Sequence, residues 1–129
     1  MYVDAHKRGA RQYAEVHTSS NLGEESPHRL IQMLMEGFLA RVNSAKGAIS
    51  HGDMESKSMY ISKAIGIVGG LNEALDLEQG GEIAINLRQL YDYINFRLLE
   101  ASSENSEQIL NEVNGLMKDV KEAWDAIAS

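Results

Sequence analysis

The chain has 129 residues, 43% of them hydrophobic and 24% charged, which is typical of a soluble globular protein with a single core. Its net charge of −7 disfavours duplex nucleic acid and anionic membrane surfaces, and its Lys and Arg residues form no basic stripe, so we expect no nucleic-acid partner. Cysteine is absent, which excludes disulfides and thiolate chemistry and is compatible with a reducing cytoplasm.

Residues 1–25 carry little periodicity and end in the turn-prone stretch "TSSNLGEES". They contain no apolar run of the kind that marks a signal peptide. The apolar stretch at residues 65–71 is far shorter than the roughly 20 residues that span a bilayer. We therefore expect a soluble protein without membrane insertion, in which a mobile arm at 1–25, partly disordered or with one short capping helix, precedes a domain at 26–129.

Ser26-Pro27 marks the start of a first helix. Serine can accept a hydrogen bond from the free amides of the first turn, and proline fits the first helical position because its missing N–H is not needed there. Gly52 ends the helix, and Asp53 is a candidate cap for the next one. The apolar residues recur at steps of three and four, as one helix face requires: Leu30, Leu34, Phe38, Val42, Ala45 and Ile49.

Three further helices follow. We predict the second at 54–75, a break at "DLEQGG", the third at 82–101, and the fourth after a polar connection "SSENS", with caps at Asn105 and Ser106. Each has one apolar face. The faces are Ile61, Ala64, Ile65, Val68, Leu71 and Leu75; then Ile83, Leu87, Leu90, Tyr91, Ile94 and Leu98; then Ile109, Val113, Leu116, Val120, Trp124 and Ile127.

These helices, each about 30 Å long and joined by short loops, predict an all-α fold: an antiparallel up-down four-helix bundle with a mobile N-terminal arm. Assigning the core leaves apolar residues over. Contiguous exposed apolar surface on a soluble protein marks interaction sites, and we hypothesise that the surplus forms grooves for a partner's helices. The groove residues are Tyr60, Ile67 and Leu71 of the second helix and Ile85, Tyr93, Phe96 and Leu99 of the third. The alternative is that some of them belong to the core or lie under the arm.

The sequence contains no catalytic constellation, and we expect neither an enzyme nor a cofactor or metal. Glu25-x-x-His28 has the spacing of di-iron bundles, but no second copy exists and Pro27 places the pair across a helix start. A histidine phosphotransfer domain needs an exposed mid-helix histidine followed by lysine and glycine, which neither His28 nor His51 provides. Gly80-Gly81 lacks the Lys and Ser/Thr of a phosphate loop.

Four stretches resemble the flagellin-specific export chaperones of bacterial flagella, the FliS family. They are "SPHRLIQMLMEG" at 26–37, "GDMESKSMYISKAIGIVGGLNEALD" at 52–76, "GGEIAINLRQLYDYINFRLLEA" at 80–101 and "EVNGLMKDVKEAWDAI" at 112–127. The arm segment "RQYAEV" at 11–16 extends the resemblance over nearly the whole chain. Met35-Glu36 stand where an aromatic-Asp pair is common, and Phe96 stands where arginine is expected, which puts the polarity of that outer surface in doubt.

The resemblance implies a helical bundle that binds the disordered C-terminal segment of flagellin in the cytosol. It also implies that the protein prevents premature polymerisation and presents flagellin to a component of the flagellar type III export gate, without nucleotide or metal. The arm would cover part of the binding surface, and Tyr13 would anchor the arm or touch the export gate, a hydrophobic staple being the alternative. A generic helical adaptor or dimerisation module, and a homodimer of the chaperone itself, stay open as alternatives.

Overall fold

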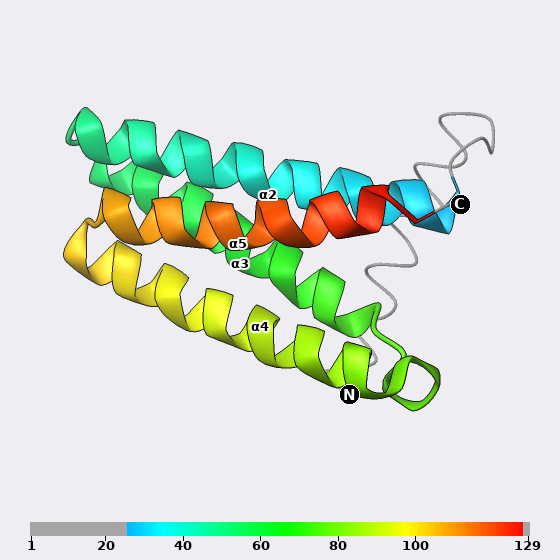
Figure 1. The fold of residues 1–129 in the computed structure, drawn as a ribbon. Helices are drawn as coiled ribbons and strands as arrows, with labels where there is room; N and C mark the ends of the chain where they lie inside the picture. The colour runs from blue at the N-terminus through cyan, green and yellow to red at the C-terminus, as the bar shows by residue number, and fades with distance from the viewer. Residues whose placement is uncertain (1–25, 128–129) are drawn as a thin grey trace.

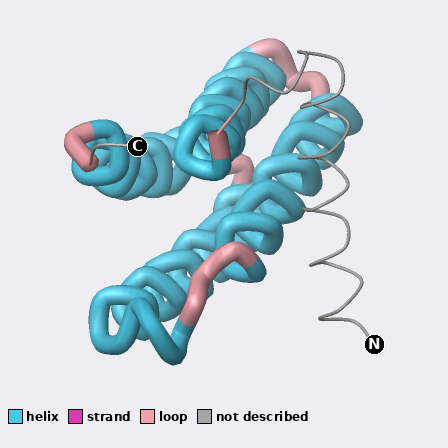
Figure 2. Tube along the Cα trace, turned by 90° about the vertical axis from the view of Figure 1, so that its right-hand side faces the viewer, coloured by secondary structure: helices cyan, strands magenta, loops and turns pink. Residues whose placement is uncertain are grey.

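The computed structural model describes residues 26–127, which form four α-helices (Figure 1). Successive helices run in opposite directions and lie side by side, and the last also packs against the first, so the predicted all-α antiparallel four-helix bundle is confirmed (Figure 2). The predicted arm lies outside the described residues. None of the described helices is both long and apolar enough to cross a membrane. The helices are α2 (Pro27–Ser50), α3 (Met54–Glu73), α4 (Leu77–Glu104) and α5 (Glu107–Asp125).

Three of the helix starts are capped as the sequence predicts. Ser26, Asp53 and Ser106 each accept a hydrogen bond from the backbone N–H three residues further on, at 3.0–3.1 Å. Pro27 occupies the first turn of α2. Each side chain satisfies one of the amide groups that a helix start leaves free, which stabilises the helix by about 1 kcal/mol.

The two ends of α4 differ from the prediction. Its first turn forms within the predicted break, because the side chain of Asp76 accepts from the backbone N–H of Gln79 at 3.0 Å. The chain then kinks at Gly81, whose φ of 55° and ψ of −133° suit glycine. At the other end α4 runs on to Glu104, and Asn105 closes it in the left-handed conformation (φ 53°) instead of capping α5.

Side chains from all four helices form one core. At its edge the side-chain amide of the buried Asn114 donates to Oδ1 of the exposed Asn43 at 3.0 Å and joins α5 to α2. Most of the predicted core positions lie in or against this core. The fully buried side chains of largest volume are Met35, Phe38, Val42, Ile61, Val68, Leu71, Ile94, Leu98, Leu110, Val113 and Met117.

The bundle has two different ends. At the closed end, where α2 and α4 finish and α3 and α5 begin, the buried Lys57 donates from Nζ to the carbonyl of Ser102 and to Oδ1 of Asn105, both at 2.8 Å. These bonds tie the start of α3 to the end of α4. At the open end, where α2 and α4 begin, α4 diverges from α5 (Figure 1).

Candidate protein-binding surface

A groove of about 470 Å³ opens between the four helices at the open end of the bundle. Its lining is apolar apart from the carboxylate of Asp119 and the hydroxyl of Tyr91. We call it the open-end groove. It is lined by Ile31 and Met35 of α2, Leu71, Ala74 and Leu75 at the end of α3, Ile83, Leu87 and Tyr91 of α4, and Asp119, Val120, Ala123, Trp124 and Ile127 in and after α5.

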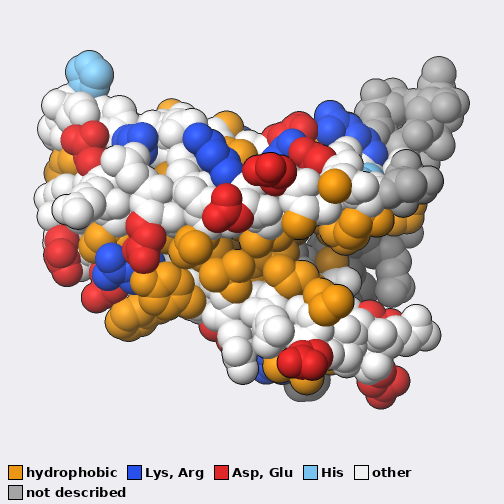
Figure 3. Space-filling view, in the orientation of Figure 1, with side chains coloured by type: hydrophobic (Ala, Val, Ile, Leu, Met, Phe, Trp, Pro, Cys, Tyr) orange, Lys and Arg blue, Asp and Glu red, His pale blue; other side chains and the backbone are white. Residues whose placement is uncertain are grey.

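The groove exists because α4 and α5 are joined in only one half of their length. Towards the closed end, Glu112 of α5 accepts from the hydroxyl of Tyr93 and from Nε of Arg97, both at 2.7 Å. Towards the open end no hydrogen bond links α4 to α5 among the described residues. Hydrophobic side chains line the seam between the two helices in the space-filling view (Figure 3).

Two residues at the open end correct the predicted core. Ile83 is 73% exposed and Ile127 is 55% exposed, although both continue the apolar periodicity of their helices. Ile83 follows the kink at Gly81, and Ile127 follows the end of α5. Each therefore lies at the open end, where the four helices no longer pack together into the core. Both line the groove instead.

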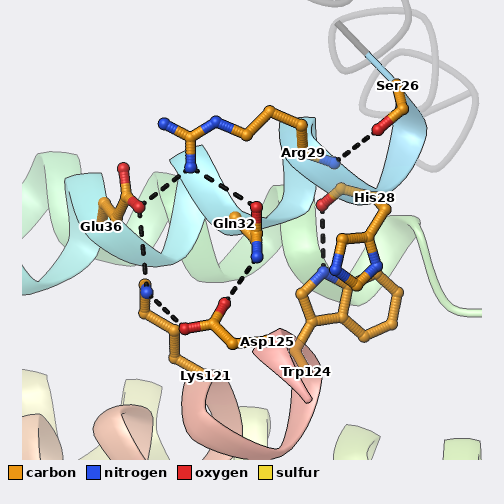
Figure 4. A network of polar contacts seen from close by, with 8 residues as sticks. All are labelled: Ser26, His28, Arg29, Gln32, Glu36, Lys121, Trp124 and Asp125. Atoms are coloured by element: carbon orange, nitrogen blue, oxygen red, sulfur yellow. Dashed lines mark hydrogen bonds and ion pairs between the residues drawn. The ribbon is translucent and has the colours of Figure 1, made fainter. Parts of the chain in front are cut away.

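Polar contacts hold the α2–α5 wall of the groove (Figure 4). The indole N–H of Trp124 donates to the carbonyl of His28 at 3.0 Å, and the two rings stack with centroids 4.6 Å apart. Gln32 donates to Asp125 at 2.7 Å, and Lys121 donates to the same carboxylate at 2.7 Å. Lys121, followed by Gln32, lowers the pKa of Asp125. The indole face of Trp124 is therefore held in place along this wall.

The α3–α4 wall is tied more lightly. Asn72 donates from its side-chain amide to Oδ1 of Asp92 at 3.1 Å. Tyr91 is almost fully buried, and burial raises its pKa to about 12. Leu71, predicted as a groove residue, is buried and lines this wall.

Two other predicted groove residues lie elsewhere on α3. Tyr60 and Ile67 are half-buried and pack against the core. Ile67 faces α2, since a Cβ added to Gly37 would lie 3.5 Å from its Cδ1. The structure therefore does not bring Tyr60 and Ile67 into the open-end groove.

The predicted residues of α4 lie on its outer side. Phe96 is 59% exposed and Leu99 61% exposed, and Tyr93 precedes them at helical spacing, so the three share one face. We call Tyr93, Phe96 and Leu99 the α4 patch. Ile85 is also exposed but lies about three turns closer to the start of α4. Tyr13 lies outside the described residues.

A charged network borders the α4 patch. Arg97 donates to Glu112 and to Glu100, both at 2.7 Å. The hydroxyl of Tyr93 and then Arg97 lower the pKa of Glu112, while the hydrogen bond to Glu112 raises the pKa of Tyr93. The network fixes the rim of the patch and leaves the rings of Tyr93 and Phe96 accessible.

The histidine and acidic side chains of the described residues are dispersed. Within residues 26–127, no group of three or more His, Asp or Glu side chains is close enough together to hold a metal ion. His28 is stacked against Trp124, and His51 bonds the carbonyl of Gly47 at 2.8 Å at the end of α2.

The fold and the groove place the chain among small helical bundles whose apolar interior is open at one end. The family described as "Flagellar protein FliS" matches residues 9–129. The flagellar secretion chaperone FliSB of Pseudomonas aeruginosa is 46% identical, over 94% of this chain and 96% of its own length. The flagellar secretion chaperone FliS of Salmonella typhimurium is 43% identical (93% and 90% covered), and that of Escherichia coli 33% identical (91% and 87%).

The chain therefore belongs to the FliS family of flagellar secretion chaperones. This confirms the family resemblance of the four sequence stretches. The names of these relatives are those of chaperones, not of enzymes.

Proposed function

We propose that this protein is an export chaperone that holds the C-terminal segment of flagellin, prevents its premature polymerisation and delivers it to the flagellar type III export gate. The observation that carries the proposal is the open-end groove, in a chain that belongs to the FliS family. Its volume of about 470 Å³ falls within the roughly 300–1,000 Å³ of clefts that bind a ligand. No nucleotide or metal takes part in the proposed mechanism.

The physical basis is the burial of apolar surface on both partners. A segment that becomes helical with one apolar stripe can insert that stripe, at positions i, i+3, i+4 and i+7, between the diverging α4 and α5. Ordering the segment consumes part of the free energy gained by burial. Binding can then be specific yet reversible, as delivery requires.

The α4 patch gives the proposal a second contact. It is apolar and exposed, and it lies on the half of α4 nearer the closed end, beyond the groove. A client segment longer than one helix would extend past the groove and cover Phe96 and Leu99 on the outer face.

Titration calorimetry with the C-terminal segment of flagellin from the same organism tests the groove. The double variant Ile83→Asp, Ile127→Asp places two charges on exposed positions of the groove rim, and we expect at least about ten-fold weaker binding, because each carboxylate would lose water against an apolar partner. Met59→Asp, also at an exposed apolar position but on α3 away from the groove lining, is the matched control and should bind as the unaltered protein does.

Circular dichroism checks that all three proteins keep their helices. Equal affinities for the groove variant, the control and the unaltered protein would contradict the proposed site. Phe96→Asp, measured in the same titration, tests the α4 patch, for which we expect a smaller loss of affinity than for the groove.

The proposed role of the arm, residues 1–25, is based on the sequence alone. We infer that residues 1–25 form an arm that covers part of the binding surface until the client displaces it, and that Tyr13 anchors the arm or contacts the export gate. Deleting residues 1–16 should change the affinity for the client or for the gate component. Unchanged affinity for both would remove the arm from the mechanism.

A further inference from the structure

Asp119 is the only charged residue among the described residues that line the open-end groove. It belongs to α5 and is exposed at the rim of the groove, among Val120, Ala123 and Trp124. It forms no hydrogen bond and no ion pair with any residue of 26–127. Asp125 of the same helix is instead bonded to Lys121 and Gln32. Glu122 is exposed and has no such partner among the described residues either, but it does not line the groove.

A carboxylate at the groove rim affects which helix can bind in the groove. A helix that lies in the groove removes water from the rim, and an unpaired carboxylate that loses water opposes binding. The same carboxylate favours an occupant that brings a cation to it. Lys and Arg are suited to this position, because their long aliphatic stems can lie along apolar lining while the charged end stays at the rim.

The buried Tyr91 adds a second polar group to the groove. It lies on α4, across the groove from α5, and its hydroxyl forms no hydrogen bond with residues 26–127. A protonated hydroxyl both donates and accepts, so it tolerates many partners. Asp119 accepts only, and it is therefore the more selective of the two groups.

We propose that Asp119 determines which helix the groove accepts: an amphipathic helix with a Lys or Arg beside its apolar stripe, whose cation pairs with the Asp119 carboxylate. The net charge of −7 on the chain favours the approach of such a helix. The inference rests on the proposed function, in that the groove is taken to hold the client, and it adds the chemical character of the client segment that binds there. An occupant lacking the cation is discriminated against, because it would leave the carboxylate unpaired.

The test is calorimetry with the flagellin C-terminal segment as the probe, against Asp119→Asn and Asp119→Lys. Glu122→Gln and Glu122→Lys are matched controls, because Glu122 is an exposed acid on the same helix that does not line the groove. We expect about five-fold weaker binding for Asp119→Asn, about thirty-fold for Asp119→Lys, and less than about two-fold for either control. Affinity should also depend less on salt in Asp119→Asn than in the unaltered protein.

A second set of probes identifies the pairing cation. Each Lys and Arg of the flagellin segment is changed in turn to Glu, and one of these peptides should bind Asp119→Lys more tightly than it binds the unaltered protein. Equal weakening by Asp119→Lys and Glu122→Lys, or unchanged binding to both Asp119 variants, would overturn the inference.

These results separate the two proposals. If Ile83→Asp, Ile127→Asp abolishes binding while the Asp119 variants bind normally, the groove holds the client and Asp119 does not select it. If the groove variant itself binds normally, the proposed site and the role of Asp119 both fall.

Discussion

The two ends of the bundle use apolar side chains differently. Near the closed end, Leu98 of α4 is fully buried in the core, and Lys57 bonds the neighbouring helix end. At the open end of the same helix, Ile83 is 73% exposed, and the space beside it forms a groove. One continuous helix therefore contributes to stability in one half and to an accessible apolar surface in the other.

The difference teaches how a small domain can keep apolar surface available without losing its fold. The core needs contacts from all four helices only along part of their length. The polar contacts of Trp124 with His28 and of Gln32 with Asp125 hold α2 to α5 where α4 has departed. The open end is thus built on a fixed wall and does not arise from loose packing of the whole bundle.

The largest expected effect comes from truncating matched residues of α4. Leu98→Ala should lower the free energy of unfolding by about 2–5 kcal/mol, because it leaves a cavity in a closed core. Ile83→Ala should change it by less than about 1 kcal/mol, since little of that side chain is buried. Urea unfolding followed by circular dichroism measures both, and similar losses for the two variants would show that the ends do not differ.

The second-largest effect is expected at the kink near the start of α4. Gly81→Ala should lower the free energy of unfolding by about 1–3 kcal/mol, because φ 55° with ψ −133° is strained for any residue with a Cβ. The same urea experiment measures the loss. A variant as stable as the unaltered protein would mean that the kink is not a fixed feature of the open end.

A substitution at Gly66 should stabilise the protein instead of destabilising it. It lies on the exposed side of α3 with regular helical neighbours, and a Cβ added there would meet nothing within 4 Å. Gly66→Ala should therefore raise the free energy of unfolding by about 1 kcal/mol through helix propensity. Client affinity should stay unchanged, because Gly66 does not line the groove; a large loss of affinity would point to a client contact on α3 instead.

The smallest expected effect is a dependence of the free energy of unfolding on pH in the acidic range. The pKa of Glu112 is lowered in the folded protein by the Tyr93 hydroxyl and Arg97, so its contribution to stability is present above its ordinary value of 4.5 and is lost as the pH falls through the folded-state pKa. Glu112 and Arg97 are open to water, so we expect their interaction to contribute less than about 1 kcal/mol to the free energy of unfolding. Glu112→Gln should flatten the fall in unfolding free energy as the pH drops below about 4.5, and an unchanged slope there would contradict this role.

The fold was predictable because its signals are local. The caps at Ser26 and Asp53 and the three-and-four spacing of apolar residues define where helices start and which face they bury. The start of α4 was missed, because its first turn depends on the Asp76 cap and on the backbone conformation of Gly81. Neither can be read from apolar spacing.

The groove was less predictable than the fold. Periodicity places Leu87, Trp124 and Ile127 on inward faces, but it cannot show whether four such faces meet along their whole length. That depends on the angle at which α4 leaves α5, which is a property of packing between distant segments. The α4 patch was easier to find, since Phe96 points directly away from its own core face, and a helical wheel shows this.

The central claim is that the open-end groove, with Trp124 along one wall, receives the client. Trp124 is the only tryptophan of the chain, so acrylamide quenching of its fluorescence can be followed with a flagellin C-terminal segment that lacks tryptophan. The account predicts that saturating client shifts the emission to shorter wavelength and lowers the quenching constant. Unchanged emission and quenching at a client concentration where calorimetry shows full binding would contradict it.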